Sequence, residues 1–193
     1  MNAQDKLNKR FADKHSAEFE DNWLKKPFTY SSWALMFKVK DHEHVIDVGC
    51  GTNPFKGKIK HLVGVDPVKI NNPNVAGADV VSPIEDFETD EKFDVAFCLG
   101  SIQFGDEAYI TKQIDKVNSL LKPTARVYWR HRIGGIATHP LDNNEVHDEE
   151  YYVWTFDRME MFAKKYGFEQ TNCQIDKNLK TDDERLYCEW HRG

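Results

Sequence analysis

Short apolar runs, each bounded by polar, glycine or proline residues, recur along the chain. Runs of this length that end in turn residues are typical of strands buried in a sheet. They predict strands at 44–48, 62–66, 76–79, 93–98 and 125–130, followed by two further β-like runs at 168–175 and 185–192.

Two other segments show the spacing of a helix. Between 106 and 121 apolar side chains recur three and four positions apart, and Pro123 follows the expected end of the helix. Between 155 and 166, Thr155 is suited to cap the first turn and Gly167 to follow the last one. Strands that alternate with helices indicate an α/β fold with a mostly parallel sheet.

A pair of glycines follows the first predicted strand, and an acid ends the second. The first strand leads through Asp47 to Gly49 and Gly51, and Asp66 stands 19 positions after Asp47. The carboxyl ends of neighbouring parallel strands meet at one edge of a sheet, so these residues should lie together. Glycine lets a ligand approach the backbone, and a carboxylate accepts hydrogen bonds from a ribose diol. The pattern predicts a nucleotide-type cofactor site.

The spacing of the glycines narrows the choice of cofactor. A dinucleotide site requires a third glycine for close helix packing, but Pro54 occupies that position, which disfavours a nicotinamide oxidoreductase. Only about ten residues separate Thr52 from the second strand, fewer than an ordinary parallel crossover needs. We therefore expect a brief helix or a turn in place of the crossover helix.

Five blocks of the sequence resemble, in order, the motifs of the class I (Rossmann-like) S-adenosylmethionine-dependent methyltransferases. Residues 45–52 read apolar-apolar-Asp-apolar-Gly-Cys-Gly-Thr, as the first motif of that family does. The later blocks lie at 65–67, 77–80, 92–101 and 119–127. The resemblance implies a Rossmann-like, doubly wound, mostly parallel sheet of seven strands, with an antiparallel last strand and helices on both faces.

The same resemblance implies transfer of a methyl group from S-adenosyl-L-methionine. It also assigns the cofactor contacts residue by residue. The implied contacts are Asp47 with the methionine ammonium, Asp66 and Pro67 at the ribose, Asp79 and Val80 at the adenine, Leu99 and Gly100 beside the adenosine, and Gly49, Cys50 and Gly51 in the loop beneath the cofactor.

We expect one domain over residues 1–193, because 193 residues with 40% hydrophobic content suit a single core and no linker is visible. Its cofactor-binding core is 44–130, and 131–193 supplies an acceptor-side loop, a helix and the final strand pair. The segment 1–40 is rich in aromatic residues, and we expect it to be helical. It either docks on the edge of the sheet or, as in related methyltransferases, forms a lid in which Tyr30 and Trp33 line the pocket.

The end of the fifth predicted strand supplies the candidates for binding an acceptor. Alternation puts Arg130 and Arg132 on one side of the strand and His131 on the other. In one interpretation His131 is a base and an arginine holds a carboxylate or phosphate of the acceptor. In the other, the arginines pair with acids of the next loop, such as Asp142 or Glu145.

Charge and missing motifs restrict the acceptor. The net charge of −6 and the scattered basic residues disfavour nucleic acid. Methyltransferases of this kind that modify amino groups of nucleic acids use an Asn/Asp-Pro-Pro-Tyr/Phe tetrapeptide after the fourth strand, and those that modify cytosine C5 use a Pro-Cys nucleophile. Neither motif occurs in this chain, which disfavours nucleic-acid bases further. Small molecules, or protein side chains reached by the open face, are left as acceptors, and a small molecule is favoured. The alternative is a non-catalytic member that binds the cofactor or regulates a partner, because the crossover is short and no base is evident.

Other features bear on location and metals. No apolar run approaches the ~20 residues of a membrane span, and the polar amino terminus does not resemble a secretory signal. The four cysteines form no C-x-x-C pair, so we expect reduced thiols in a cytoplasmic protein. His139 and His147 lie among acids in a spacing that matches no ligand pattern, so we expect no metal.

Overall fold

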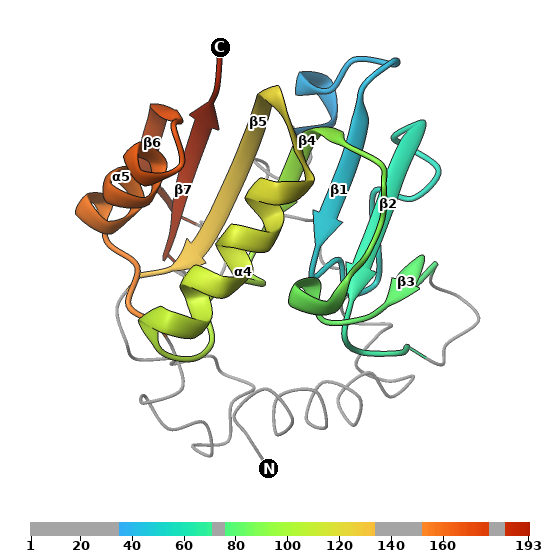
Figure 1. Ribbon diagram of the computed structural model, residues 1–193, viewed down its shortest axis with the longest axis horizontal. Coiled ribbons are helices and arrows are strands. Elements are labelled where there is room, and N and C mark those ends of the chain that lie inside the picture. Colours follow the sequence, from blue (N-terminus) through green and yellow to red (C-terminus); the bar gives the residue numbers. More distant parts are fainter. Residues whose placement is uncertain (1–34, 71–75, 134–151, 178–183) are drawn as a thin grey trace.

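A seven-stranded sheet forms the centre of the computed structural model, which describes residues 35–70, 76–133, 152–177 and 184–193. The strand order is β3-β2-β1-β4-β5-β7-β6 (Figure 1). The first five strands pair in parallel, and β7 runs antiparallel to both β5 and β6, as predicted. The strands are β1 (His44–Val48), β2 (His61–Asp66), β3 (Val80–Val81), β4 (Phe93–Cys98), β5 (Leu121–Arg132), β6 (Glu169–Lys177) and β7 (Glu184–His191).

Two α-helices, α4 (Glu107–Leu120) and α5 (Phe156–Lys165), cover one face of the sheet (Figure 1). Thr155 caps α5, as the sequence predicts. Asp106 caps α4 by accepting a hydrogen bond from the amide of Tyr109 at 2.8 Å. The apolar stripes of the two helices pack against β4, β5 and β7 in the larger of two core clusters. No helix in the described ranges is long and apolar enough to cross a membrane.

The opposite face is covered differently. A short 3-10 helix, η1 (Leu35–Lys38), and the turn between β1 and β2 pack there in a second cluster. The turn is held by hydrogen bonds from the Asn53 amide to the Cys50 carbonyl at 2.8 Å and from the Lys56 amide to the Asn53 carbonyl at 3.1 Å. Phe55 is buried, with its ring 5.2 Å from that of Phe97. The link between β1 and β2 is thus a turn, one of the two expected outcomes, and its Phe55 packs in the second core cluster.

Two strands, β3 and β5, differ from their predicted bounds by four residues at one end, and β5 begins at Leu121 where 125 was predicted. β3 begins at Val80, after the predicted 76–79, and pairs with the last two residues of β2. A second 3-10 helix, η2 (Ile84–Asp86), follows it. β5 continues through Arg132, beyond the predicted end at 130, because β7 pairs along its whole second half. The bounds of β3 and β5 are set by hydrogen-bonded pairing with neighbouring strands. A run of apolar residues in the sequence does not reveal that pairing.

The prediction of four reduced thiols is wrong for one pair. Cys173 of β6 and Cys188 of β7 stand opposite each other in the antiparallel ladder, with their Cα atoms 4.0 Å apart, and form a disulfide. The register of two strands created this proximity, and spacing in the sequence did not reveal it. Cys50 and Cys98 are free and buried, as expected.

Candidate functional site

The loops after β1 and β4 touch at the carboxyl end of the sheet. Gly49 lies just past β1 with a positive φ of 67°, and its amide donates to the carbonyl of Val65 in β2 at 2.7 Å. A Cβ on Gly49 would lie 2.2 Å from the Cβ of Ser101, which follows β4. Both the conformation and the contact therefore require glycine here.

Asp66 ties the glycine loop to the end of β2. Its Oδ2 accepts a hydrogen bond from the Gly51 amide at 2.8 Å, and its Oδ1 accepts one from the Val68 amide at 2.8 Å. Burial raises the pKa of Asp66, and the two backbone hydrogen bonds oppose that rise. The predicted proximity of Gly51 and Asp66 is present in the structure.

Asp47 lies beneath this loop, near the end of β1. Its side chain is almost fully buried, and burial together with the nearby charge of Asp66 raises the pKa of Asp47 to about 7. Such a carboxyl would gain greatly from a cation placed beside it. Burial and the neighbouring acids also raise the pKa of the Cys50 thiol far above its usual range, so that thiol stays protonated.

Asp79 is engaged by the turn after β1 and by β2. Its Oδ2 accepts hydrogen bonds from the Gly64 amide at 2.9 Å and from Asn53 Nδ2 at 3.4 Å, and its Oδ1 pairs with Lys56 Nζ. These contacts fasten the turn after β1 to the middle of β2, and they hold the pKa of Asp79 low despite partial burial. The adenine contact that the resemblance implies for Asp79 stays a prediction.

Ser82 directly follows β3, and its amide donates to the carbonyl of Asp66 at 3.0 Å. Val80 lies within β3, opposite Val65, and packs against the larger core cluster. Leu99 packs against the other cluster, and Gly100 has a positive φ of 101° just past β4. The contacts of these residues with an adenosine stay predictions.

A small hollow of about 40 Å³ adjoins Gly49. Three polar atoms in its lining residues, Ser101 Oγ, Glu85 Oε2 and Gln113 Oε1, are buried and have no hydrogen-bond partner in the described part of the chain. Sequence reasoning missed all three, because they come from η2, α4 and the loop after β4. The hollow is lined by Val48, Gly49, Val65, Pro67, Pro83, Ile84, Glu85, Ser101, Ile102, Tyr109 and Gln113.

His131 does not face an open acceptor site in this structure. It is 0% exposed, and its ring stacks on that of Trp154 with centroids 4.4 Å apart. Burial lowers the pKa of His131 to about 3, so the imidazole is neutral. The indole of Trp154 donates to the carbonyl of Ile102 at 2.9 Å, which fixes it over the imidazole. A role for His131 as base would require Trp154 to move.

Arg130 lies with its Nε 3.7 Å from Asp176 Oδ2 of β6, so the ion pair that the sequence suggested forms with a different acid. The side chains of Tyr30, Trp33 and Arg132, and the loop with His139 and His147, lie outside what the structure describes. Among the side chains that it does describe, no group of three His, Cys, Asp or Glu residues is placed to hold a metal ion.

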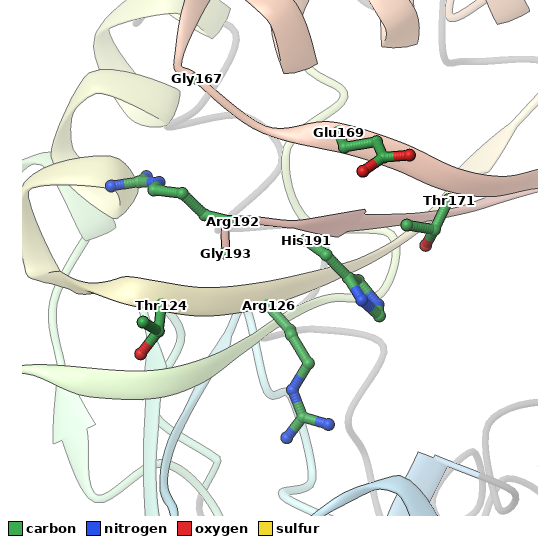
Figure 2. Close-up of a pocket in the computed structure, with 8 residues that line it drawn as sticks. All are labelled: Thr124, Arg126, Gly167, Glu169, Thr171, His191, Arg192 and Gly193. Atoms are coloured by element: carbon green, nitrogen blue, oxygen red, sulfur yellow. The ribbon is translucent and has the colours of Figure 1, made fainter.

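A larger hollow of about 460 Å³ lies at the other end of the sheet, where β5 begins and β7 ends (Figure 2). Its basic groups are already engaged: Arg126 pairs with Glu43 at 2.6 Å, and Arg192 stacks over the ring of Phe168 at 4.0 Å. Figure 2 shows these two arginine side chains pointing in different directions. The hollow therefore presents no converging set of charges.

No protein-family model and no curated protein matches the chain by sequence. Solved structures do match its fold. The 1,6-didemethyltoxoflavin-N1-methyltransferase of Burkholderia thailandensis, solved with 1,6-didemethyltoxoflavin and S-adenosylhomocysteine, superposes with a TM-score of 0.73 at 15% identity, over 96% of this chain and 87% of that one. The chain has the fold of the S-adenosylmethionine-dependent methyltransferases.

Two further methyltransferases share this fold over nearly their whole length. The N-methyltransferase NodS of Bradyrhizobium japonicum WM9, in complex with S-adenosylhomocysteine, gives a TM-score of 0.68 at 13% identity, over 100% of this chain and 99% of that one. The magnesium protoporphyrin IX methyltransferase ChlM of Synechocystis PCC 6803, with bound S-adenosylhomocysteine, gives 0.65 at 12% identity, over 96% and 99%. The methyltransferase fold predicted from the motifs is confirmed.

Proposed function

We propose that this chain is an S-adenosylmethionine-dependent methyltransferase that acts on a small or medium-sized acceptor. The observation that carries the proposal is the junction of Gly49, Gly51 and Asp66, above the buried Asp47, at the carboxyl end of a methyltransferase sheet. The three neighbours named above support the choice of cofactor, because each was solved with S-adenosylhomocysteine. Two of them are named for different small molecules, 1,6-didemethyltoxoflavin and magnesium protoporphyrin IX, which supports a small-molecule acceptor but does not select one.

The described residues suit the three parts of this cofactor. Asp47 would balance the charge of the methionine ammonium, since its carboxyl is buried and needs a cation to ionise fully. Gly49 and Gly51 expose the backbone to close approach. Asp66 receives two amide hydrogen bonds, and a carboxylate has about four lone-pair sites, so two remain for the ribose hydroxyls.

The bound cofactor supplies a methyl group that is already activated by the sulfonium. The protein then needs to position the acceptor and to exclude water, and both can be done without a charged catalytic group. The burial of His131 agrees with such a site. An acceptor atom with a free lone pair would need no base, whereas a hydroxyl would need one from elsewhere in the chain.

The alternative is a non-catalytic protein that binds the cofactor through the same contacts but transfers no methyl group. The short turn after β1 motivates it, since that turn stands where a crossover helix is expected. A cytoplasmic location stays a prediction. The disulfide between Cys173 and Cys188 weighs against it, because reducing compartments disfavour such bonds.

Calorimetric titration with S-adenosylmethionine and S-adenosylhomocysteine tests the proposal. We expect micromolar binding of both by the unaltered chain and at least tenfold weaker binding by Asp47→Asn, roughly the loss of one charge-assisted contact. Asp94→Asn is the matched control, because Asp94 lies at the amino end of β4 and pairs with Lys122.

Binding of reduced nicotinamide dinucleotide in place of either ligand would contradict the proposal. Binding of S-adenosylmethionine without turnover on a broad panel of amines, hydroxy acids and heteroaromatic acceptors would favour the non-catalytic alternative. Formation of S-adenosylhomocysteine, followed by mass spectrometry, would establish the enzyme and identify its acceptor class.

A further inference from the structure

The disulfide lies between the aromatic core and the edge of the sheet, on the face that carries α4 and α5. Cys98 of β4 is the register partner of Trp129 in β5, and Trp129 is in turn the partner of Cys188 in β7. Cys188 is bonded to Cys173 of β6, the outermost strand. All four residues belong to or pack against the larger core cluster. The bond therefore fastens an edge strand to the core.

The two bonded sulfurs differ in access from outside the protein. Cys188 is 0% exposed, whereas Cys173 is only partly buried. Cys173 stands on a strand that pairs with β7 alone, and Ile175 of the same strand is half exposed. Strands at an edge open locally more readily than strands inside a sheet. Exchange with another thiol requires access to a sulfur, so an external thiolate would attack Cys173.

The pairing of β6 with β7 does not depend on the bond. The ladder runs from Glu169 opposite His191 to Lys177 opposite Glu184, and Trp190 Nε1 also donates to Gln170 Oε1 at 3.3 Å. Two thiols in place of the bond would face an apolar cluster, where a thiol behaves as a small apolar side chain. The buried free thiol of Cys98 in the same row shows that this environment accommodates one. Both redox forms are therefore compatible with the sheet.

We propose that Cys173 and Cys188 are a site of reversible thiol–disulfide exchange that controls the release of β6 from the edge of the sheet. The co-reactant is a small thiol such as glutathione. Its thiolate attacks Sγ of Cys173, the S–S bond breaks, and the sulfur of Cys188 leaves and takes the proton that the attacking thiol lost. A second thiol then displaces Cys173 from the mixed disulfide. Two external thiols are thus oxidised to one disulfide while the protein gains two thiols.

Release of β6 has a consequence at the end of β5. β6 carries Asp176, whose Oδ2 lies 3.7 Å from Arg130 Nε. The cross-link keeps β6 beside β7 and so maintains this ion pair, whereas the dithiol form lets the strand separate and withdraw Asp176. This consequence alone rests on the proposed function, in which Arg130 is a candidate for holding the acceptor. The exchange itself is independent of that function.

Titration of the folded chain in glutathione redox buffers tests the exchange. After denaturation, the oxidised chain should show only Cys50 and Cys98 as reactive thiols, and the reduced chain should show all four cysteines. Reoxidation should restore the first pattern. Hydrogen exchange of the β6 amides should be at least about tenfold faster in the dithiol form, because the bond restrains the opened strand. Exchange of the β1 and β2 amides should not change.

Matched variants separate the bond from other effects. Cys173→Ala should give fast exchange of β6 in every buffer, whereas Cys98→Ala, which removes a free thiol from the same row, should keep the response. Gln170→Ala should speed reduction, because it removes a side-chain hydrogen bond between β6 and Trp190. Gln174→Ala makes the same chemical change at an exposed residue of β6 and should leave the rate of reduction unchanged.

Four reactive thiols after treatment with glutathione disulfide would overturn the proposal. So would a bond that resists glutathione in the folded chain, because it would then be a permanent cross-link. Unfolding of the whole sheet on reduction, or equal exchange of the β6 amides in both forms, would also overturn it. Failure to bind S-adenosylmethionine would instead contradict the proposed function, and the thiol counts and exchange rates would stand apart from that result.

Discussion

The amide of Gly51 donates to the carboxylate of Asp66 across 2.8 Å, and this bond joins the loop after β1 to the end of β2. Asp66 therefore supports the loop even without a ligand. Asp66→Ala should lower the free energy of unfolding by about 1–3 kcal/mol, because it leaves the amides of Gly51 and Val68 without their acceptor. Chemical denaturation measures this, with the exposed Asp41→Ala as control. An unchanged free energy of unfolding would mean that Asp66 serves ligand binding alone.

The close contact between Gly49 and Ser101 leads to a prediction about the stability of Gly49 variants. Gly49→Ala adds a Cβ 2.2 Å from Ser101 Cβ at a positive φ, so it should destabilise the protein by about 2 kcal/mol or more. Gly51→Ala, with a positive φ but no neighbour within 4 Å, should show only the backbone cost of about 1–2 kcal/mol. The double variant Gly49→Ala, Ser101→Gly should recover the difference. Additive effects in this double-mutant cycle would argue against the contact.

The raised pKa of Asp47 makes stability depend on pH. Its folded pKa of about 7 lies above the ordinary value of 3.8, so the native state holds an extra proton between those values. The free energy of unfolding should fall as pH rises from about 4 to about 7, by at most about 1.4 kcal/mol for each pH unit, and should then level off. Unfolding measured at several pH values should show this decline. Asp47→Asn should weaken this decline of the free energy of unfolding. An identical decline in that variant would mean that other titratable groups cause it.

Cofactor binding should show the opposite trend with pH. The methionine ammonium favours the ionised form of Asp47, which is scarce below about pH 7. Affinity for S-adenosylhomocysteine should therefore rise by up to about tenfold per pH unit until pH 7 and then become constant. Titration in two buffers that differ in ionisation enthalpy would also detect the released proton. A flat profile would place the ammonium away from Asp47.

His131 is a candidate base from the sequence but lies buried in the structure, and variants of this residue can distinguish the two roles. Its imidazole is buried against Trp154, and neither ring nitrogen has a hydrogen-bond partner among the described residues. His131→Phe should keep or raise the free energy of unfolding, because it replaces unpaired polar atoms by an apolar ring, whereas His131→Ala should lower it by about 3 kcal/mol through a cavity. Once an acceptor is known, normal turnover of His131→Phe would assign this residue to the core. Loss of turnover with an intact fold would restore it as a base.

The sequence alone determined most of the sheet and half of the site. Five elements were predictable because their apolar periodicity and capping residues are local features of the sequence. They are β1, β2, β4, α4 and α5. The proximity of three site residues, Gly49, Gly51 and Asp66, was also predictable. The carboxyl ends of neighbouring parallel strands lie at one edge of a sheet, so residues that follow those ends must lie close together. These features depend on local chemistry and on one general rule of topology.

Tertiary structure decided the rest. The hydrogen bond from the Gly64 amide to Asp79 depends on the register of β3 beside β2. Cys173 and Cys188 are expected to be free thiols from the sequence, but the pairing of β6 with β7 brings them together. Likewise Glu85 and Gln113 became neighbours only when η2 and α4 packed over the same hollow. Each outcome depends on strand register or packing between distant segments. Those are set by the burial of the whole core, and no local pattern in the chain records them.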